Sequence, residues 1–167
     1  KITYPTDLGK SVIGNGFDVH PLVEGRPLRL GGVCIPFPKG LLGHSDADVL
    51  VHAVMDAVLS AAGEADIGHQ FPDTDERYRN ADSMELFRQV RQKTQRLHIH
   101  GISCVVAAEQ PKLAPYLDEM RKNLASTANV PTECVNISAT TTEKLGIVGE
   151  GKGIAAYAVC LGELLPV

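Results

Sequence analysis

Residues 43–59 of the chain read GHSDADVLVHAVMDAVL, and the second half of this segment has the spacing of a helix. Apolar side chains recur every three or four positions, which predicts a helix over about 47–62 that ends near Gly63. Ser45 or Asp46 is the expected N-cap, because a short polar side chain can accept a hydrogen bond from a free N–H group of the first turn. We expect the chain to be organised around this helix.

The polar half of the same segment suits two kinds of site. His44 and Ser45 lie at the predicted mouth of the helix, where free N–H groups and the positive end of the dipole favour an anion. Asp48 and His52 lie one turn apart and so project from one side of the helix. A lone histidine on a half-apolar helix is usually a core or surface residue, so His52 alone is a weak candidate for a metal ligand.

A second segment strengthens the metal-site hypothesis. Residues 17–20 read FDVH, and the alternation of a strand would point Asp18 and His20 to the same face. Together with His52 they form an Asp, His, His set. Three nitrogen or oxygen ligands with one position left open are the composition of a catalytic zinc site rather than a closed structural one.

The composition indicates one globular domain. The chain has 167 residues, of which 44% are hydrophobic and 22% charged, which is ordinary for a folded domain with its own core. We expect residues 11–167 to form a single catalytic domain and residues 1–10 to form a loose arm or a tag remnant. The net charge of −4 gives no general reason to expect nucleic acid or a membrane surface as a partner. No apolar run approaches the ~20 residues of a membrane span.

The cysteines do not form a recognisable metal or redox motif. They are scattered along the chain without a C-x-x-C pair, at Cys34, Cys104, Cys134 and Cys160. This spacing favours a reducing compartment over a zinc–thiolate site.

The remaining elements predict a layered α/β fold. We expect strands over 11–20, 99–109, 135–142 and 154–164, a hairpin over 28–35, and helices over 82–97 and 114–128. The apolar run at 105–108 indicates a strand buried on both faces. Helices between strands imply an α/β fold (an α+β sandwich), with helices on one face of a mixed, four-stranded sheet. The other face must be buried elsewhere, and self-association around a symmetry axis is the economical solution.

Two further segments carry polar groups, and each has a plain alternative. Residues 65–75 read ADIGHQFPDTD, which is either a simple connector or a place where carboxylates accept hydrogen bonds from the vicinal hydroxyls of a sugar. Residues 139–146 read ATTTEKLG. The threonines are either ordinary strand formers or hydroxyl donors beside Glu143, which would suit a phosphate chelated with Mg²⁺.

Taken together, five segments resemble the 2-C-methyl-D-erythritol 2,4-cyclodiphosphate synthase family of the non-mevalonate isoprenoid pathway. They are GFDVH at 16–20, GHSDAD at 43–48, DIG at 66–68, FPDTD at 71–75 and TTTEKLG at 140–146. The resemblance covers about residues 13–164. It implies a mixed sheet with helices on one side, a homotrimer with the sheets facing the threefold axis, and active sites between neighbouring subunits. It also implies a cytoplasmic protein in a bacterium, or a plastid protein in a plastid-bearing organism.

The resemblance implies a cyclising phosphorus–oxygen lyase. The family converts 4-diphosphocytidyl-2-C-methyl-D-erythritol 2-phosphate to 2-C-methyl-D-erythritol 2,4-cyclodiphosphate and releases CMP, through attack of the 2-phosphate on the β-phosphorus. The nucleophile is already part of the substrate, so the protein mainly has to hold the reacting ends in line and neutralise charge. The implied cofactors are Zn²⁺ and a second divalent cation, Mg²⁺ or Mn²⁺. The implied partners are this cytidine diphosphate substrate and two further copies of the chain.

Roles carry over from the family residue by residue. The implied zinc ligands are Asp18, His20 and His52, and Glu143 is implied to carry the second cation. His44 and Thr141 are implied to stabilise the transition state. The implied substrate-binding residues are Asp18, Val19, His20, His44, Ser45, Asp66, Ile67, Gly68, Phe71, Pro72, Asp73, Thr74, Asp75, Ala108, Glu109, Gln110, Pro111, Lys112, Leu113, Ala114, Thr140, Thr141, Thr142 and Glu143.

Within this set, each part of the substrate has its own segment in the family. His44 and Ser45 match the site for the methylerythritol phosphate end. Residues 66–68 match the ribose site, and 71–75 match a flexible loop over the erythritol. Residues 108–114 match the cytosine pocket, which reads the base largely through backbone groups.

Several interpretations stay open at this stage. Asp48 either orients His52 from behind or is only a carboxylate at the start of the helix, and Asp56 has no assigned role. Two other function classes compete with the synthase. One is a zinc hydrolase acting on a phosphoester, in which the metal would activate water. The other is a non-catalytic trimeric binding module.

The chain departs from the family pattern at Glu150. Many members carry an arginine at this place, close to the threefold axis, where it can hold the diphosphate of an isoprenoid lying in a central apolar cavity. Ile147 and Val148 keep the apolar lining. Three symmetry-related carboxylates would repel a diphosphate, unless Glu150 points to solvent. We therefore expect that geranyl and farnesyl diphosphate are not retained.

Overall fold

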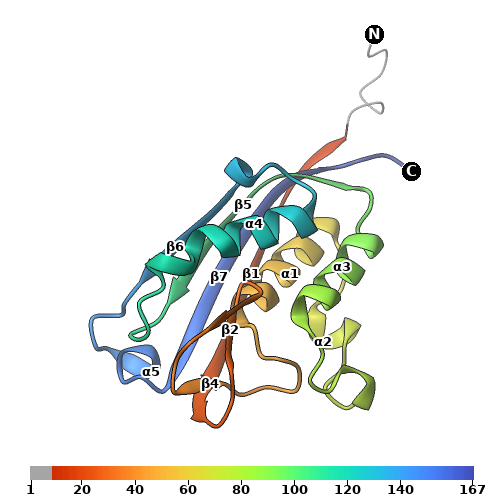
Figure 1. Cartoon of the computed structure of the whole chain (residues 1–167). Coiled ribbons are helices and arrows are strands. Elements are labelled where there is room, and N and C mark those ends of the chain that lie inside the picture. The colour runs from red at the N-terminus through yellow and green to blue at the C-terminus, as the bar shows by residue number, and fades with distance from the viewer. Residues whose placement is uncertain (1–8) are drawn as a thin grey trace.

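The computed structural model describes residues 9–167, and most of the arm expected over residues 1–10 lies outside the described part, at residues 1–8 (Figure 1). The main sheet has five strands in the order β4-β1-β7-β5-β6, and β2 and β3 form a separate two-stranded sheet. The strands are β1 (Lys10–Glu24), β2 (Leu28–Leu30), β3 (Val33–Ile35), β4 (Lys39–Leu41), β5 (Leu97–Ala107), β6 (Val135–Thr140) and β7 (Gly153–Leu164). β5 and β6 run parallel and the other neighbours antiparallel, so the sheet is mixed, as predicted.

The prediction of four strands was wrong by one. The fifth strand, β4, has only three residues, and it pairs with the end of β1, where Leu22 lies opposite Leu41. Its sequence Lys39-Gly40-Leu41 is too short to show an alternating pattern. Tertiary pairing creates this strand, so the sequence carries no local signal for it.

Helices α1 to α4 lie on one face of the sheet (Figure 1). The helices are α1 (Val49–Ala62), α2 (Ile67–Gln70), α3 (Ser83–Lys93), α4 (Leu117–Ala128) and the short α5 (Gly146–Gly149), whose Val148 packs on the opposite face against Ala107 and Ala155. α1 packs against β1 and β7, and α4 packs against β6. α3 ends four residues earlier than predicted because β5 already begins at Leu97, and α2 lies inside the segment expected to be a loop. Among the described residues, no helix is both long and apolar enough to cross a bilayer.

α1 begins later than predicted, and its N-cap is neither Ser45 nor Asp46. Ala47 has a φ of 57°, a left-handed backbone conformation that cannot belong to the helix. The chain therefore turns there, and Asp48 becomes the N-cap, accepting a hydrogen bond from the Val51 N–H at 3.1 Å. The buried Asp48 carboxylate also accepts from the N–H groups of Gly31 (2.9 Å) and Gly32 (2.8 Å). This favours the helix-start interpretation of Asp48 over a contact with the His52 ring.

Two glycines of β1 let α1 lie directly on the strand. A side chain at Gly14 would overlap the carbonyl oxygen of Ala57, and one at Gly16 would overlap the carbonyl oxygen of Ala53. Both obstacles are backbone atoms of a helix, which cannot move without displacing the helix itself. This close approach brings His52, one residue before Ala53, over the adjacent part of β1.

Apart from the end where Val148 of α5 packs on Ala107 and Ala155, the described residues leave the opposite face of the sheet uncovered. Its exposed large side chains come from β1, β5 and β7, and they are Ile13, Phe17, Val19, Val105, Tyr157, Val159 and Leu161. The rings of Phe17 and Tyr157 pack on one another with centroids 4.7 Å apart. Within one chain, the apolar run at 105–108 is buried as predicted except at Val105, which is 38% exposed on this side. Exposed apolar surfaces of this kind are typical of sites that bind another protein, a membrane or a ligand.

All four cysteines are free thiols. Cys104 and Cys160 are buried beneath the helices, and burial raises the pKa of Cys104 to about 12 and that of Cys160 to about 11. Thiols with such pKa values stay protonated at neutral pH.

Candidate metal centre and active site

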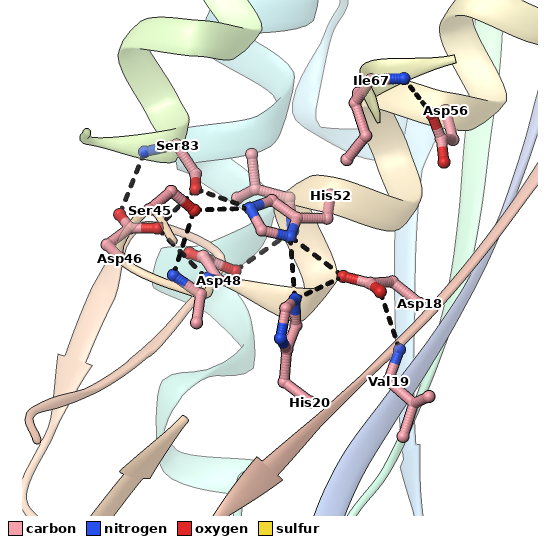
Figure 2. A network of polar contacts seen from close by, with 12 residues as sticks. Asp18, Val19, His20, Ser45, Asp46, Asp48, His52, Asp56, Ile67 and Ser83 are labelled. Carbon is pink, nitrogen blue, oxygen red and sulfur yellow. Dashed lines mark hydrogen bonds and ion pairs between the residues drawn. The ribbon is translucent and has the colours of Figure 1, made fainter. Parts of the chain in front are cut away.

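Asp18, His20 and His52 converge at one point, as Figure 2 shows. Asp18 Oδ2 lies 2.9 Å from His20 Nε2 and 2.9 Å from His52 Nδ1. The two nitrogen atoms are 3.2 Å apart. Asp18 and His20 come from β1, where they point to the helix-covered face, and His52 comes from the first turn of α1. The strand alternation and the helix position therefore act together to assemble the cluster.

The triangle formed by these three atoms fits a metal ion. Four ligands at the usual 2.0–2.1 Å around a tetrahedral zinc lie about 3.3 Å from one another. The distances of 2.9, 2.9 and 3.2 Å approach this value without any rearrangement of the backbone. One carboxylate and two imidazoles are also a donor set that zinc accepts.

The other ring nitrogen of His20 and of His52 also has a hydrogen-bond partner. His20 Nδ1 lies 2.8 Å from the carbonyl oxygen of Leu42 and must donate to it. His52 Nε2 lies 3.1 Å from Ser45 Oγ and 3.0 Å from Ser83 Oγ. A histidine that donates from one nitrogen presents the lone pair of the other, which is the orientation that metal-binding histidines show.

The electrostatics of the cluster favour an ionised carboxylate. Burial alone would raise the pKa of Asp18, but hydrogen bonds with His20 and His52 and their positive charge lower it to about 2. Burial would lower the pKa of His20, and the hydrogen bond with the Asp18 carboxylate raises it instead. Asp18 is therefore ionised across the physiological pH range, as a metal ligand must be.

The cluster opens into a cavity of about 550 Å³. Beside the cluster, six of the residues expected to bind substrate line it, namely His44, Ser45, Ile67, Gly68, Phe71 and Asp73. Gly43, Met55, Tyr78 and Leu86 also line it, although the sequence assigned none of them a role in binding. Tyr78 packs edge-on against Phe71 with ring centroids 5.2 Å apart, which the sequence spacing of seven residues did not suggest.

His44 and Ser45 reach the cavity through their side chains rather than through the mouth of α1. The expected anion site at the helix mouth is occupied by the Asp48 carboxylate, which already accepts from the first turn. His44 Nε2 lies 3.1 Å from the carbonyl oxygen of Asp75, and Ser45 is buried. Arg26, another residue without a sequence signal, donates to the carbonyl oxygen of Ser45 at 3.0 Å.

The segment 65–75 is ordered by its own carboxylates. Asp66 caps α2 and accepts from the N–H group (3.0 Å) and the ring (2.8 Å) of His69. Asp56 of α1 accepts from the Ile67 N–H at 2.9 Å, which ties α1 to the start of α2 (Figure 2). Asp75 forms an ion pair with Arg77 at 2.6 Å, so this carboxylate already has a cationic partner.

A second group of expected residues lies elsewhere on the sheet. Residues 108–114 follow β5 and residues 140–143 end β6 and follow it, and the Ala108 N–H donates to the carbonyl oxygen of Thr140 at 3.0 Å. Among the described residues these stretches do not line the cavity of the metal cluster. Val19 of β1 pairs with Ala155 of β7, and Ala155 pairs with Ala107 of β5. Ala107 in turn pairs with Thr140 of β6. Three strand spacings separate Val19 from Thr140, or roughly 14 Å.

The turn that carries Glu143 is strained. Glu143 and Lys144 have φ angles of 54° and 63°, which residues other than glycine rarely adopt. Thr141 Oγ1 donates to the Glu143 carboxylate at 3.1 Å and accepts from the Glu143 N–H at 3.3 Å. Strained backbone of this kind concentrates at functional sites, where the surrounding contacts hold it in place.

The fold and the site define an α/β protein with a candidate catalytic metal centre. The comparison with known sequences is more specific, because residues 11–163 match the YgbB family and the chain belongs to that family. It is 56% identical over 151 residues to the 2-C-methyl-D-erythritol 2,4-cyclodiphosphate synthase of Methylobacillus flagellatus, covering 89% of this chain and 94% of the relative. The synthase of Geobacillus kaustophilus is 58% identical over 153 residues, with coverages of 89% and 96%.

Solved structures show the same fold. A 2C-methyl-D-erythritol-2,4-cyclodiphosphate synthase in a CDP-bound form superposes with a TM-score of 0.81 at 38% identity, covering 90% of this chain and 99% of that one. The bifunctional IspDF of Campylobacter jejuni gives a TM-score of 0.90 at 42% identity and covers 95% of this chain. This chain spans only 43% of that larger protein.

Proposed function

We infer that the protein converts 4-diphosphocytidyl-2-C-methyl-D-erythritol 2-phosphate to 2-C-methyl-D-erythritol 2,4-cyclodiphosphate and CMP. The observation that carries this inference is the convergence of Asp18, His20 and His52 on a cavity that His44, Ser45 and Asp73 also line. The relatives that match nearly the whole chain bear the name of this synthase. The reaction requires a phosphate of the substrate to be brought onto its own diphosphate, so holding the two ends is the main task of the protein.

Each group of residues has a proposed part in this task. Asp18, His20 and His52 would hold zinc, and Glu143 would hold Mg²⁺ or Mn²⁺. When bound, the two ions neutralise charge on the reacting phosphates. Hydrogen bonds from His44 and Thr141 would stabilise the negative oxygens that develop during the transfer.

The three parts of the substrate would be held by different segments. His44 and Ser45 would bind the methylerythritol phosphate end, with residues 71–75 over the erythritol. Residues 66–68 would bind the ribose, and Asp66 would accept from its hydroxyls. Residues 108–114 would bind the cytosine and read it through backbone groups, which suits a stretch of such plain composition.

We propose that the active site forms between subunits of a homotrimer. Thr140 and the metal cluster lie several strands apart in one chain. Asp18 and His20 point to the helix-covered side of the sheet. Thr140 pairs with Ala107, which lies in register with Val19 on the opposite side. Within one chain, the sheet therefore separates Thr140 from the metal cluster. Packing the apolar faces of three sheets together would cover them and bring residues 140–143 of one subunit toward the cavity of the next.

The assembly predicts a mass and a mutant phenotype. The solution mass should be three times 17.9 kDa. Ile13→Glu should shift the protein to monomer and remove most activity, because Ile13 is 70% exposed on the uncovered face and a carboxylate there would have to be buried. Gln89→Glu, which adds the same charge on the exposed side of α3, is the matched control and should remain trimeric and active. Light scattering that finds a fully active monomer would refute the assembly.

A zinc hydrolase of phosphoesters is the competing function, and nucleotide binding separates the two. A protein that releases CMP from a cytidine diphosphate substrate should bind CMP, and should bind it more tightly than UMP or AMP if residues 108–114 read the base. A phosphoester hydrolase has no reason to bind CMP selectively. Isothermal titration with the three nucleotides distinguishes them, and equal affinities would argue against the cytosine pocket.

The departure at Glu150 predicts a loss of isoprenoid binding. Glu150 is half-exposed and pairs with Lys152 at 2.6 Å, so the two side chains together present no net positive charge. Ile147 is exposed, whereas Val148 is buried against Ala107 and Ala155. A diphosphate in the trimer cavity would therefore lack the charge-assisted hydrogen bonds that an arginine provides.

We expect the wild-type trimer to purify without geranyl or farnesyl diphosphate, and Glu150→Arg to create or strengthen their binding. Native mass spectrometry of both proteins, with and without added isoprenoid diphosphate, checks this. A wild-type trimer that retains the ligand would show that the charge argument fails.

A further inference from the structure

A chain of hydrogen bonds leads from the metal cluster to the start of α3 (Figure 2). His52 Nε2, the ring nitrogen that faces away from Asp18, lies 3.0 Å from Ser83 Oγ. Ser83 Oγ in turn donates to Asp46 Oδ1 in a short hydrogen bond, and the Ser83 N–H donates to Asp46 Oδ2 at 3.0 Å. Asp46 and Ser83 are 37 positions apart in the sequence, so only the fold brings them together.

The direction of these hydrogen bonds is fixed by the chemistry of the three groups. An ionised carboxylate only accepts hydrogen bonds, so the single hydroxyl proton of Ser83 belongs to Asp46. Ser83 Oγ then has only lone pairs left for His52. The His52 Nε2 atom must therefore carry a proton. With a metal bound, Nδ1 would present its lone pair to the ion, whereas without one Nδ1 donates to the Asp18 carboxylate at 2.9 Å.

His52 depends on this arrangement more than His20 does. The partner of His20 Nδ1 is a backbone carbonyl group, which can only accept. The partners of His52 are two hydroxyl groups, Ser45 and Ser83, which can either donate or accept. Ser83 is fully buried and His52 is 7% exposed, so water cannot readily replace a lost partner.

The same arrangement has a consequence for Ser45. Ser45 Oγ lies 3.1 Å from His52 Nε2 and accepts from the Ala47 N–H at 3.3 Å. With Nε2 fixed as a donor, Ser45 can only accept from it. The hydroxyl proton of Ser45 is then left for an acceptor in the cavity that this residue lines, such as a phosphate oxygen.

We propose that Ser83 and Asp46 are positioning residues for the candidate metal ligand His52, which hold its ring as an Nε2 donor so that Nδ1 binds the metal and the Ser45 proton is free for the substrate. This inference rests on the proposed metal centre. Partners of this kind typically change metal affinity by 10- to 100-fold when they are removed.

The test compares three variants of the full-length protein. Ser83→Ala removes the hydroxyl link, and Asp46→Asn places an amide donor where a carboxylate oxygen now accepts. Asp82→Asn is the matched control, because Asp82 also caps the start of α3, accepting from the Met84 N–H at 2.8 Å, but has no hydrogen bond to the His52 network. All three are first compared with wild type by thermal unfolding of the metal-free protein.

The readouts are the zinc affinity, from competition with a chelator, and the visible spectrum of the cobalt-loaded protein. We expect Ser83→Ala and Asp46→Asn to bind zinc 10- to 100-fold more weakly and to shift the cobalt bands. Asp82→Asn should match wild type in both, whatever its unfolding temperature. If Ser83→Ala does not fold, Asp46→Asn decides the outcome by the same comparison with Asp82→Asn.

Two results would overturn the positioning role alone. The first is wild-type zinc affinity and spectrum in the folded Ser83 and Asp46 variants, and the second is an equal weakening in Asp82→Asn. If the wild-type protein itself binds no zinc, the proposed metal centre is wrong and the positioning role falls with it. Wild-type zinc binding therefore separates failure of the inference from failure of the function on which it rests.

Discussion

Replacing His52 with alanine is expected to reduce turnover by orders of magnitude while the fold is kept. The variant removes Nδ1 from the cluster and leaves only Asp18 and His20, and two ligands hold zinc far less well than three. Asp18 also loses one of the two histidines that lower its pKa. The fold should survive because α1 keeps its apolar contacts with β1 and β7.

Metal content, thermal unfolding and turnover are measured together on this variant. Val58→Ala, which removes a buried side chain from the same helix without touching the ligand set, is the control for a general loosening of α1. The control should lose some stability and keep its zinc. If purified wild type carries no zinc, and zinc added to the metal-free protein changes nothing, the three-ligand assignment is wrong.

Glu143→Gln is expected to abolish turnover with zinc still bound. The substitution keeps the size of the side chain and the acceptor for Thr141 Oγ1, but it removes the negative charge that would hold the second cation. Glu143 lies on the strained turn after β6, away from Asp18, His20 and His52, so the zinc ligands are untouched.

The measurement is turnover across a series of Mg²⁺ and Mn²⁺ concentrations, with zinc content determined in parallel. Glu133→Gln, a charge-matched change in the 3-10 turn before β6, should behave as wild type. Activity in Glu143→Gln that equals wild type at every cation concentration would remove the proposed role.

The sequence predicted the candidate metal cluster because its parts are local patterns. The alternation of Phe17-Asp18-Val19-His20 places Asp18 and His20 on one face, and the helical spacing around His52 places that residue on a buried helix. Their convergence depends on Gly14 and Gly16, which let α1 rest on the backbone of β1. The glycines are visible in the sequence, but the sequence does not show which helix packs on them. The distance between His52 and the two residues of β1 could therefore be learned only from the fold.

The sequence could not assign the aspartates that follow His44. Asp46 and Asp48 are two positions apart, and spacing along a helix left Asp48 as either a neighbour of His52 or a carboxylate at the helix start. The left-handed backbone at Ala47 turns the chain between them, so that Asp48 caps α1 and Asp46 reaches Ser83 instead. Local propensity gives no warning of such a turn, since alanine rarely adopts it.

Local sequence patterns also could not predict that the expected site residues fall into two separate groups. Residues 108–114 and 140–143 meet because β5 and β6 are parallel neighbours, and they lie across the sheet from β1 because β7 is inserted between β1 and β5. Strand order is set by the packing of the whole chain. A sequence reading can give the strands and still not give their order.

Phosphorus-31 NMR of the turnover mixture tests the central claim most directly. The metal-loaded protein is incubated with 4-diphosphocytidyl-2-C-methyl-D-erythritol 2-phosphate and Mg²⁺, and the phosphorus signals are followed over time. We predict that CMP and the cyclic diphosphate appear in equal amounts, because both come from one intramolecular transfer. Release of CMP with an uncyclised product, or no release of CMP at all, would contradict the account.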